Sequence, residues 1–305
     1  MLDAIVRPWR KPHGALSQSR LDQGRGCVLE RISAPDILRE AWRRVRANKG
    51  GPGGDGVTLA VFEQQLDCNL ADLAGSLRDG RYRPGRLRRA VIVKPDGRPR
   101  TLAIPGIRDR VAQTAALVVI GPMLDPRLSE SSFAYRPGRG VDDAVAAVAA
   151  AFAAGRVWTL DADVARYFDR VPHGRLLEEL AIWLDQEAVL GLFALWLRSF
   201  SRFGRGIAQG SPISPLLANL FLHPLDRLVA AAGCMMVRYA DDFVVLAAGE
   251  PQLRAAQAGI ATVLRRRGLA LNAGKTRIVA PGREFVFLGR TLCAPVPPRL
   301  GHVVR

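Results

Sequence analysis

Two neighbouring aspartates, Asp241 and Asp242, interrupt the largely apolar stretch of residues 235–246. Side chains of a continuous strand point alternately to opposite faces, so two adjacent carboxylates can act together only where the chain turns. Aspartate is favoured in turns and disfavoured inside strands. The pair therefore predicts a hairpin with both carboxylates at its turn. An ordinary hairpin turn would explain one of the two aspartates, so the alternative to a chemical site stays open at this point.

A second acidic segment lies upstream, where Asp161 and Asp163 follow an apolar run. On a strand these two residues share one face, and the neighbouring Leu160 and Val164 indicate that the strand enters the core. A buried strand has no structural need for carboxylates. Carboxylates held close together repel one another, which raises the pKa of one of them unless a cation is shared. Mg²⁺ is the expected cation, because it prefers carboxylates together with substrate phosphates.

Together the two acidic segments resemble the palm of a reverse transcriptase, in which a strand with a single aspartate lies beside a Tyr-x-Asp-Asp hairpin. The resemblance is closest to the reverse transcriptases of bacterial group II introns and their relatives, and it covers residues 37–290. Seven segments carry it in the family's order: 94–100, 132–140, 158–173, 206–220, 235–246, 268–276 and 285–289. So many ordered matches exclude coincidence.

The resemblance implies RNA-directed DNA polymerisation, in which a primer 3′-hydroxyl attacks the α-phosphorus of a nucleotide. In such sites two metal ions about 3.5–4 Å apart stabilise the attacking and leaving oxygens. The family pattern implies Asp163, Asp241 and Asp242 as catalytic metal ligands, with the carbonyl of Val164 as a further ligand. Two Mg²⁺ ions are expected, and Mn²⁺ can substitute. Lys275 is implied as a catalytic proton donor to the departing pyrophosphate.

The nucleotide is expected to contact Lys94, Arg100, Phe168 and Gln209. Lys94 and Arg100 flank a Pro-Asp-Gly turn, which indicates a fingertip hairpin whose cations meet the triphosphate. Taken alone, that segment would be a solvated basic hairpin. The resemblance places Phe168 against the sugar, where a ring would exclude a 2′-hydroxyl, and Gln209 beside the template–primer minor groove. An aromatic residue on a strand is more often part of the core.

Nucleic acid is the partner that the charge indicates. The formal net charge is +16 and the pI is about 11.0, which would attract a duplex of phosphates. The expected partners are an RNA template, a DNA or RNA primer and deoxynucleotides. The resemblance places template and primer against these residues: Arg136, Gly210, Ser211, Pro212, Phe287, Leu288 and Gly289.

Several other classes of protein are excluded. No apolar run reaches the length of about 18 residues that a membrane helix needs, and the first residues lack the apolar core of a signal peptide, so a cytoplasmic protein without a membrane partner is expected. The four cysteines lack metal-ligand spacing, which argues against a zinc site. Residues 272–276 superficially resemble a phosphate-binding loop, but residue 269 is leucine where that loop needs glycine.

The elements that must position these residues form an α+β right-hand polymerase, with fingers and a palm whose antiparallel sheet is backed by helices. No thumb or maturase domain is evident. The expected organisation is a flexible arm at 1–34, fingers at 35–156, a palm at 157–290 and a short tail at 291–305. The glycine-rich run at 50–56 is interpreted as a flexible turn. Helices are expected near 36–48, 59–78, 108–120, 141–154, 174–199, 214–231 and 251–267.

The biological setting stays open among intron mobility, CRISPR spacer acquisition and phage defence. Retron and diversity-generating enzymes fit less well, because the Ala-Gln-Gly-Ser-Pro loop is of the group II type. Without an evident thumb, a protein partner that supplies thumb or integrase function is expected. Three other functions remain: a non-catalytic RNA-binding scaffold with a palm fold, a template-independent polymerase and an RNA-synthesising polymerase.

Overall fold

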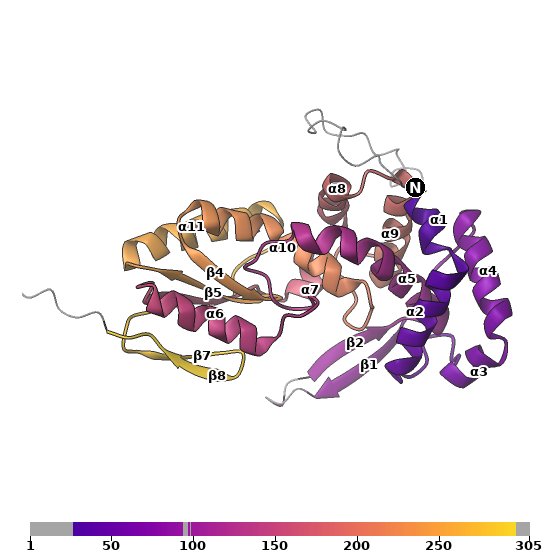
Figure 1. The fold of residues 1–305 in the computed structure, drawn as a ribbon, viewed down its shortest axis with the longest axis horizontal. Helices are drawn as coiled ribbons and strands as arrows, with labels where there is room; N and C mark the ends of the chain where they lie inside the picture. The colour runs from indigo at the N-terminus through magenta and orange to yellow at the C-terminus, as the bar shows by residue number, and fades with distance from the viewer. Residues whose placement is uncertain (1–26, 94–96, 98, 297–305) are drawn as a thin grey trace, which may run out of the picture.

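The computed structural model describes residues 27–93, 97 and 99–296. The described chain forms a mainly helical lobe joined to a lobe built around a four-stranded antiparallel sheet (Figure 1). This arrangement confirms the predicted α+β fold. Among the helices described, none is both long and apolar enough to cross a membrane.

The helical lobe is built around α5 (Ile107–Leu124), which is buried on nearly every side. The helices α1 (Val28–Ile32), α2 (Pro35–Ala47) and α4 (Leu66–Arg78) pack around α5 and one another, and the short α3 (Leu59–Gln64) precedes α4. The hairpin of β1 (Arg88–Val93) and β2 (Pro99–Ile104) projects from this lobe. This hairpin is the predicted fingertip.

Two boundaries in this lobe differ from the prediction. The arm predicted over 1–34 is too long at its C-terminal end, because α1 buries Val28 and Ile32 in the core; residues 1–26 lie outside the described residues. The single helix predicted near 59–78 is two helices, because Gln65 leaves helical geometry with φ −125° and ψ 41°. The remaining domain boundaries stay predictions.

The glycine-rich run at 50–56 is packed and anchored, which corrects its interpretation as a flexible turn. A Cβ on Gly53 would lie 2.4 Å from the backbone nitrogen of Gly106, so only glycine fits this approach. Arg88 Nε donates to the carbonyl of Pro52 at 2.7 Å, and Arg110 Nη2 donates to that of Gly51 at 2.6 Å. These partly buried hydrogen bonds fix the run in place, and the positions of their donors could not be read from the glycines alone.

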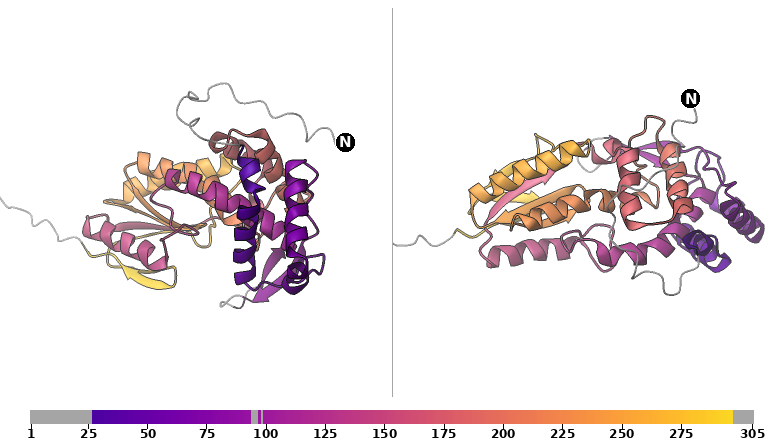
Figure 2. Two further views of the ribbon diagram at one scale, coloured as in Figure 1. Left: turned by 45° about the vertical axis from the view of Figure 1, so that its right-hand side comes forward. Right: turned by 90° about the horizontal axis from the view of Figure 1, so that it is seen from above.

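The sheet lobe has the strand order β4-β5-β3-β6, with every neighbouring pair antiparallel. Its strands are β3 (Trp158–Asp163), β4 (Met235–Tyr239), β5 (Asp242–Ala247) and β6 (Arg277–Val279). Helix α11 (Glu250–Arg266) covers one face, while α6 (Val141–Ala153) and the hairpin of β7 (Glu284–Phe287) and β8 (Arg290–Cys293) cover the other (Figures 1 and 2). Burial on both faces explains the unbroken apolar run of β5.

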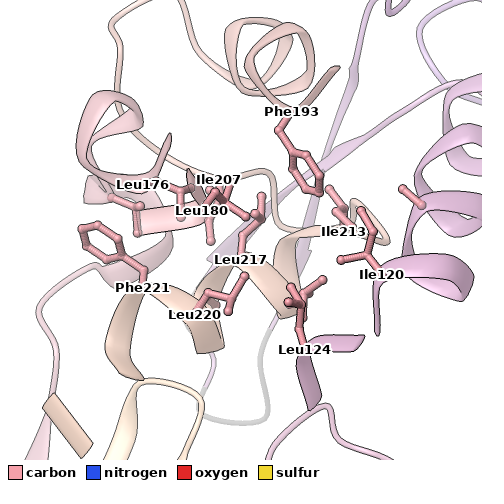
Figure 3. Packing of buried hydrophobic residues seen from close by; sticks show 14 of the residues in the cluster. Ile120, Leu124, Leu176, Leu180, Phe193, Ile207, Ile213, Leu217, Leu220 and Phe221 are labelled. Atoms are coloured by element: carbon pink, nitrogen blue, oxygen red, sulfur yellow. The ribbon is translucent and has the colours of Figure 1, made fainter. Parts of the chain in front are cut away.

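A continuous core joins the two lobes. It brings α5 together with α8 (His173–Trp183), α9 (Glu187–Phe200) and α10 (Ser214–Ala231), through residues such as Leu124, Phe193 and Leu217 (Figure 3). The stretch predicted as helical near 174–199 is thus two helices, α8 and α9. The short helices η1 (Asp125–Arg127) and α7 (Tyr167–Arg170) complete the described elements. Because packed interiors are dense and stiff, this core fixes the loops around the sheet edge.

Candidate active site

The two adjacent aspartates lie at the turn between β4 and β5. Tyr239 pairs with Asp242, which leaves Ala240 and Asp241 as a two-residue turn. Ala240 has the left-handed φ of 61°, which such tight turns require. The predicted hairpin is confirmed, with Asp241 in the turn and Asp242 as the first residue of β5.

Asp163 ends β3 directly opposite Asp242 in the β3–β5 ladder. Opposed residues of an antiparallel pair point to the same face, so the two side chains are cross-strand neighbours. The Val164 N–H donates to the Asp241 carbonyl at 3.2 Å, which ties the end of β3 to the turn. All three aspartates are half-buried. The fold therefore brings together three carboxylates that are up to 79 positions apart (242 minus 163).

The carboxylates perturb one another electrostatically. Burial is the main reason why the pKa of Asp242 rises to about 7, and the negative charges of Asp163 and Asp161 raise it further. Lys275 acts in the opposite direction. Burial also raises the pKa of Asp161, although its ion pair with Arg277, 3.1 Å away, opposes that shift. A site with this concentration of negative charge favours a bound cation.

Asp163 is held by a segment that follows α11. The Asn272 side-chain Nδ2 donates to Asp163 Oδ2 at 2.9 Å, and the Asn272 backbone N–H donates to the Asp163 carbonyl at 2.7 Å. Lys275 Nζ lies 3.4 Å from the same Oδ2 atom. The structure thus brings Lys275 to the site, as predicted. Asn272 was not predicted as a site residue; its place in the family-like segment 268–276 was the available signal.

The donor chemistry fits a hard divalent cation, because carboxylate oxygens are the ligands that Mg²⁺ prefers. Within the described part of the chain, no three His, Cys, Asp or Glu side chains converge closely enough to hold a metal ion together. Asp163 and Asp242 instead form a facing pair, and Asp241 lies beside them in the turn. Asp163, Asp241 and Asp242 are the residues that would hold such an ion.

The residues predicted to contact the nucleotide have different outcomes. The Phe168 ring is 8% exposed and packs edge-on against Tyr167, with 5.6 Å between ring centroids. The Gln209 carbonyl accepts from the Ala103 N–H of β2 at 2.7 Å, so the fingertip hairpin and the 206–212 loop adjoin. Lys94 lies outside the described residues, and of Arg100 only the backbone, in β2, is described.

Three residues predicted to bind template or primer have buried side chains that contact other parts of the protein, and their contact with nucleic acid stays a prediction. Arg136 is buried and donates to the Asp125 carboxylate at 2.8 Å and to the Ser129 carbonyl at 2.7 Å, among other acceptors. Ser211 is buried, and its hydroxyl donates to Gln113 Oε1 at 2.7 Å. Phe287 is 1% exposed in the core under α6. Of the residues predicted beside them, Gly210, Pro212, Leu288 and Gly289 remain at least partly accessible.

Known proteins share this sequence pattern. Residues 92–292 match the model of the family described as reverse transcriptase (RNA-dependent DNA polymerase). Protein YkfC of Escherichia coli (strain K12) is 29% identical over 317 residues, which cover 87% of this chain and 82% of YkfC. The group II intron-encoded protein LtrA of Lactococcus lactis subsp. cremoris is 26% identical over 225 residues, which cover 70% of this chain but only 37% of LtrA.

Comparison with solved structures gives two further similarities. An apo telomerase from Candida tropicalis, truncated from its C-terminal domain, superposes with a TM-score of 0.52 at 12% identity, covering 75% of this chain and 59% of that one. A chain of a partial Cas6-RT-Cas1–Cas2 complex superposes with a TM-score of 0.48 at 26% identity, covering 79% of this chain and 42% of that one. The family model spans about two thirds of the sequence and includes all three aspartates, so the chain belongs to the reverse transcriptases, the RNA-dependent DNA polymerases.

Proposed function

We propose that the chain extends a primer with deoxynucleotides along an RNA template, using Asp163, Asp241 and Asp242 as the metal-binding carboxylates. The observation that carries this proposal is the register of β3 against β5, which puts Asp163 opposite Asp242 with Asp241 in the adjoining turn. When bound, two Mg²⁺ ions would stabilise negative charge on the attacking and leaving oxygens. Mn²⁺ is the expected substitute.

The protein residues have separate roles in this proposal. The three carboxylates supply hard oxygen ligands, and the Val164 carbonyl adds a further one. Lys275, whose ammonium is half-exposed beside Asp163, gives a proton to the departing pyrophosphate. Lys94 and Arg100 neutralise the triphosphate, since phosphoryl transfer depends mainly on positioning and electrostatics.

The remaining roles concern the nucleic acid. Phe168 limits the space beside the sugar and so favours DNA as product. Gln209, Gly210 and Pro212 line the template side, and the Leu288–Gly289 turn lies on the primer side. The net charge of +16 supports tight, salt-dependent binding of the duplex. We propose that the protein acts in the cytoplasm, because RNA, primer and deoxynucleotides are present there.

The biological setting is a further proposal. The similarity to LtrA, a group II intron-encoded protein, supports intron-type RNA as the first template to test. CRISPR spacer acquisition and phage defence are the alternatives, each with a protein partner that supplies thumb or integrase function. The chain requires a partner if primer extension needs an added protein although the chain binds the duplex without that protein.

The direct experiment is extension of a labelled DNA primer on an RNA template with Mg²⁺ and deoxynucleotides. The Asp241→Ala/Asp242→Ala variant is expected to lose extension while still binding the duplex. A matched control, Asp67→Ala/Asp79→Ala, removes two carboxylates that are 79% and 55% exposed on the helical lobe, and it is expected to retain activity. Extension by the Asp241→Ala/Asp242→Ala variant would contradict the assignment of the site, and duplex binding without extension by the native chain would favour the scaffold function.

A further inference from the structure

Arg238 carries a buried charge close to the catalytic turn. It lies in β4, three residues before Asp241, and its side chain has no exposed surface. Its Nε and Nη2 atoms donate to the two carboxylate oxygens of Asp226 on α10, each at 2.7 Å. The Asp226 side chain is likewise fully buried. The two form a bidentate ion pair beneath the turn.

The third nitrogen of Arg238 reaches the turn itself. Nη1 donates to the carbonyl of Ala240 at 3.0 Å and to Asn219 Oδ1 at 3.1 Å. Ala240 is the residue with the left-handed φ of 61°. A residue with a Cβ keeps this conformation only where its surroundings hold it. The Arg238 guanidinium supplies such a restraint immediately before the two aspartates.

Asn219 extends the network to a third segment. Its Nδ2 atom donates to the Ala134 carbonyl at 2.8 Å, and its Oδ1 atom also accepts from the Ser132 hydroxyl at 3.3 Å. The Arg238 N–H donates to the Ser131 carbonyl at 2.7 Å, and the Arg238 carbonyl accepts from the Phe133 N–H at 2.9 Å. Helix α10, the 131–134 segment and the catalytic hairpin are therefore fixed to one another through Arg238.

Stability alone does not explain this pair, because replacing a buried ion pair by packed apolar residues is often neutral or stabilising. A planar guanidinium has a rigid fork of donors, which suits a role in fixing geometry. We propose that Arg238 and Asp226 are positioning residues: they hold the Ala240–Asp241 turn so that Asp241 and Asp242 present their carboxylates toward Asp163. This inference rests on the proposed metal-binding function of the three aspartates.

The test compares variants that change the Arg238–Asp226 ion pair with a variant that breaks a different buried ion pair. Arg238→Lys keeps the charge but loses the fork, and Asp226→Asn keeps a side-chain acceptor but loses the charge. The control is Glu179→Gln, which breaks the pair with Arg267 (2.8 Å; side chains 10% and 17% exposed) between α8 and the end of α11. The readouts are Mn²⁺ binding without nucleotide, thermal unfolding in EDTA, and the Mg²⁺ concentration for half-maximal extension.

We expect Arg238→Lys and Asp226→Asn to weaken Mn²⁺ binding by about 10- to 100-fold, the range seen when a group that orients a ligand is lost. Both should raise the half-maximal Mg²⁺ concentration and leave duplex affinity unchanged. Glu179→Gln should lower the melting temperature and leave Mn²⁺ binding as in the native chain. Native Mn²⁺ affinity in Arg238→Lys and Asp226→Asn, despite a lower melting temperature, would overturn the inference and leave the pair a structural role only.

A double variant guards against loss of folding. Arg238→Gln/Asp226→Asn removes both charges together, so it avoids an uncompensated buried charge. We expect it to melt closer to the native chain than either single variant while its Mn²⁺ binding stays weak; native binding would overturn the inference. If the native chain binds Mn²⁺ but does not extend a primer, the proposed polymerase function fails, yet the comparison of Mn²⁺ affinities still decides the role of Arg238.

Discussion

The ammonium group of Lys275 lies 3.4 Å from Oδ2 of Asp163, the same oxygen that accepts from Asn272. The Lys275 ammonium therefore forms an ion pair with Asp163, one of the three carboxylates that we propose bind metal. A divalent ion bound at Asp163 would compete with Lys275 for the charge of that carboxylate, which would link metal affinity to the proposed proton donor. Lys275 is half-exposed, which limits the strength of its ion pair.

Lys275→Met is expected to bind Mn²⁺ about two- to fivefold more tightly in the absence of nucleotide, which is the range that an exposed ion pair supports. Extension at saturating metal should instead slow by about 10²- to 10⁴-fold if the ammonium donates a proton. Lys275→Arg is the control, because it keeps the charge but titrates too high to release a proton readily. Fast extension by both variants would contradict the proton-donor role.

Metal binding should stabilise the fold more strongly at high pH. Asp242 has a folded-state pKa of about 7 against an ordinary value of 3.8, so between these pH values the folded chain holds more protons than the unfolded chain. Without metal, the contribution of Asp242 to the free energy of unfolding therefore falls as pH rises through this window. Bound Mg²⁺ would offset the loss by neutralising the ionised carboxylate.

The measurement is the Mg²⁺-induced rise in melting temperature at about pH 5.5 and about pH 8.5, on either side of this titration. We expect the larger rise at the higher pH, because Asp242 is then ionised. Asp242→Asn should remove most of the difference and raise the melting temperature in EDTA at the higher pH. An equal Mg²⁺ effect at both pH values in the native chain would show that Asp242 is not a ligand.

Substitution of Phe168 should relax the choice of sugar. Phe168→Val replaces the ring that we place beside the 2′ position with a smaller side chain. The ratio of kcat/KM for ribonucleotides to that for deoxynucleotides is expected to rise by about tenfold or more. Tyr167→Phe is a suitable control: it removes the hydrogen bond from the Tyr167 hydroxyl to the Ala218 carbonyl, 2.6 Å, but leaves both rings in place. An unchanged ratio in Phe168→Val would rule out the steric gate.

Loss of Arg136 should affect folding rather than nucleic-acid binding. Arg136→Met removes a donor from the Asp125 carboxylate, which is 30% exposed, and from the carbonyls of Ser129 and Ser132, which is expected to cost about 1–3 kcal/mol of unfolding free energy. The salt dependence of duplex binding by the folded variant should match that of the native chain. A decrease of about one in the slope of log affinity against log salt would instead indicate a phosphate contact.

Much of the fold follows from local sequence pattern. The apolar β-branched runs predicted the strands on either side of the Asp241–Asp242 turn, and turn chemistry predicted the hairpin itself. The helical stretches were found at the right places, although Gln65 divides one of them in a way that periodicity does not show. Periodicity reports which face is apolar, whereas a break in backbone geometry depends on how the two helices pack.

The exposure of individual site residues did not follow from the sequence. Ser211 hydrogen-bonds to Gln113, 98 positions away, and Arg136 binds the carboxylate of Asp125. Residue type indicates which contacts are chemically possible, but only the surrounding fold decides whether a donor is used internally or left for a ligand. For the same reason the proposed role of Arg238 could not be predicted, because the sequence alone does not distinguish Arg238 from the other arginines of a basic protein.

The sequence by itself determined the chemistry of this protein: carboxylates at the ends of two strands, a basic surface and the order of the family's motifs. Tertiary structure alone decided that Asp163 faces Asp242, that Asn272 and Lys275 meet at Asp163, and that Arg238 supports the turn. The physical reason is that these contacts, apart from the local one between Arg238 and Ala240, join residues far apart in the chain. Their distances are set by strand register and by the packing of the core, which local pattern does not encode.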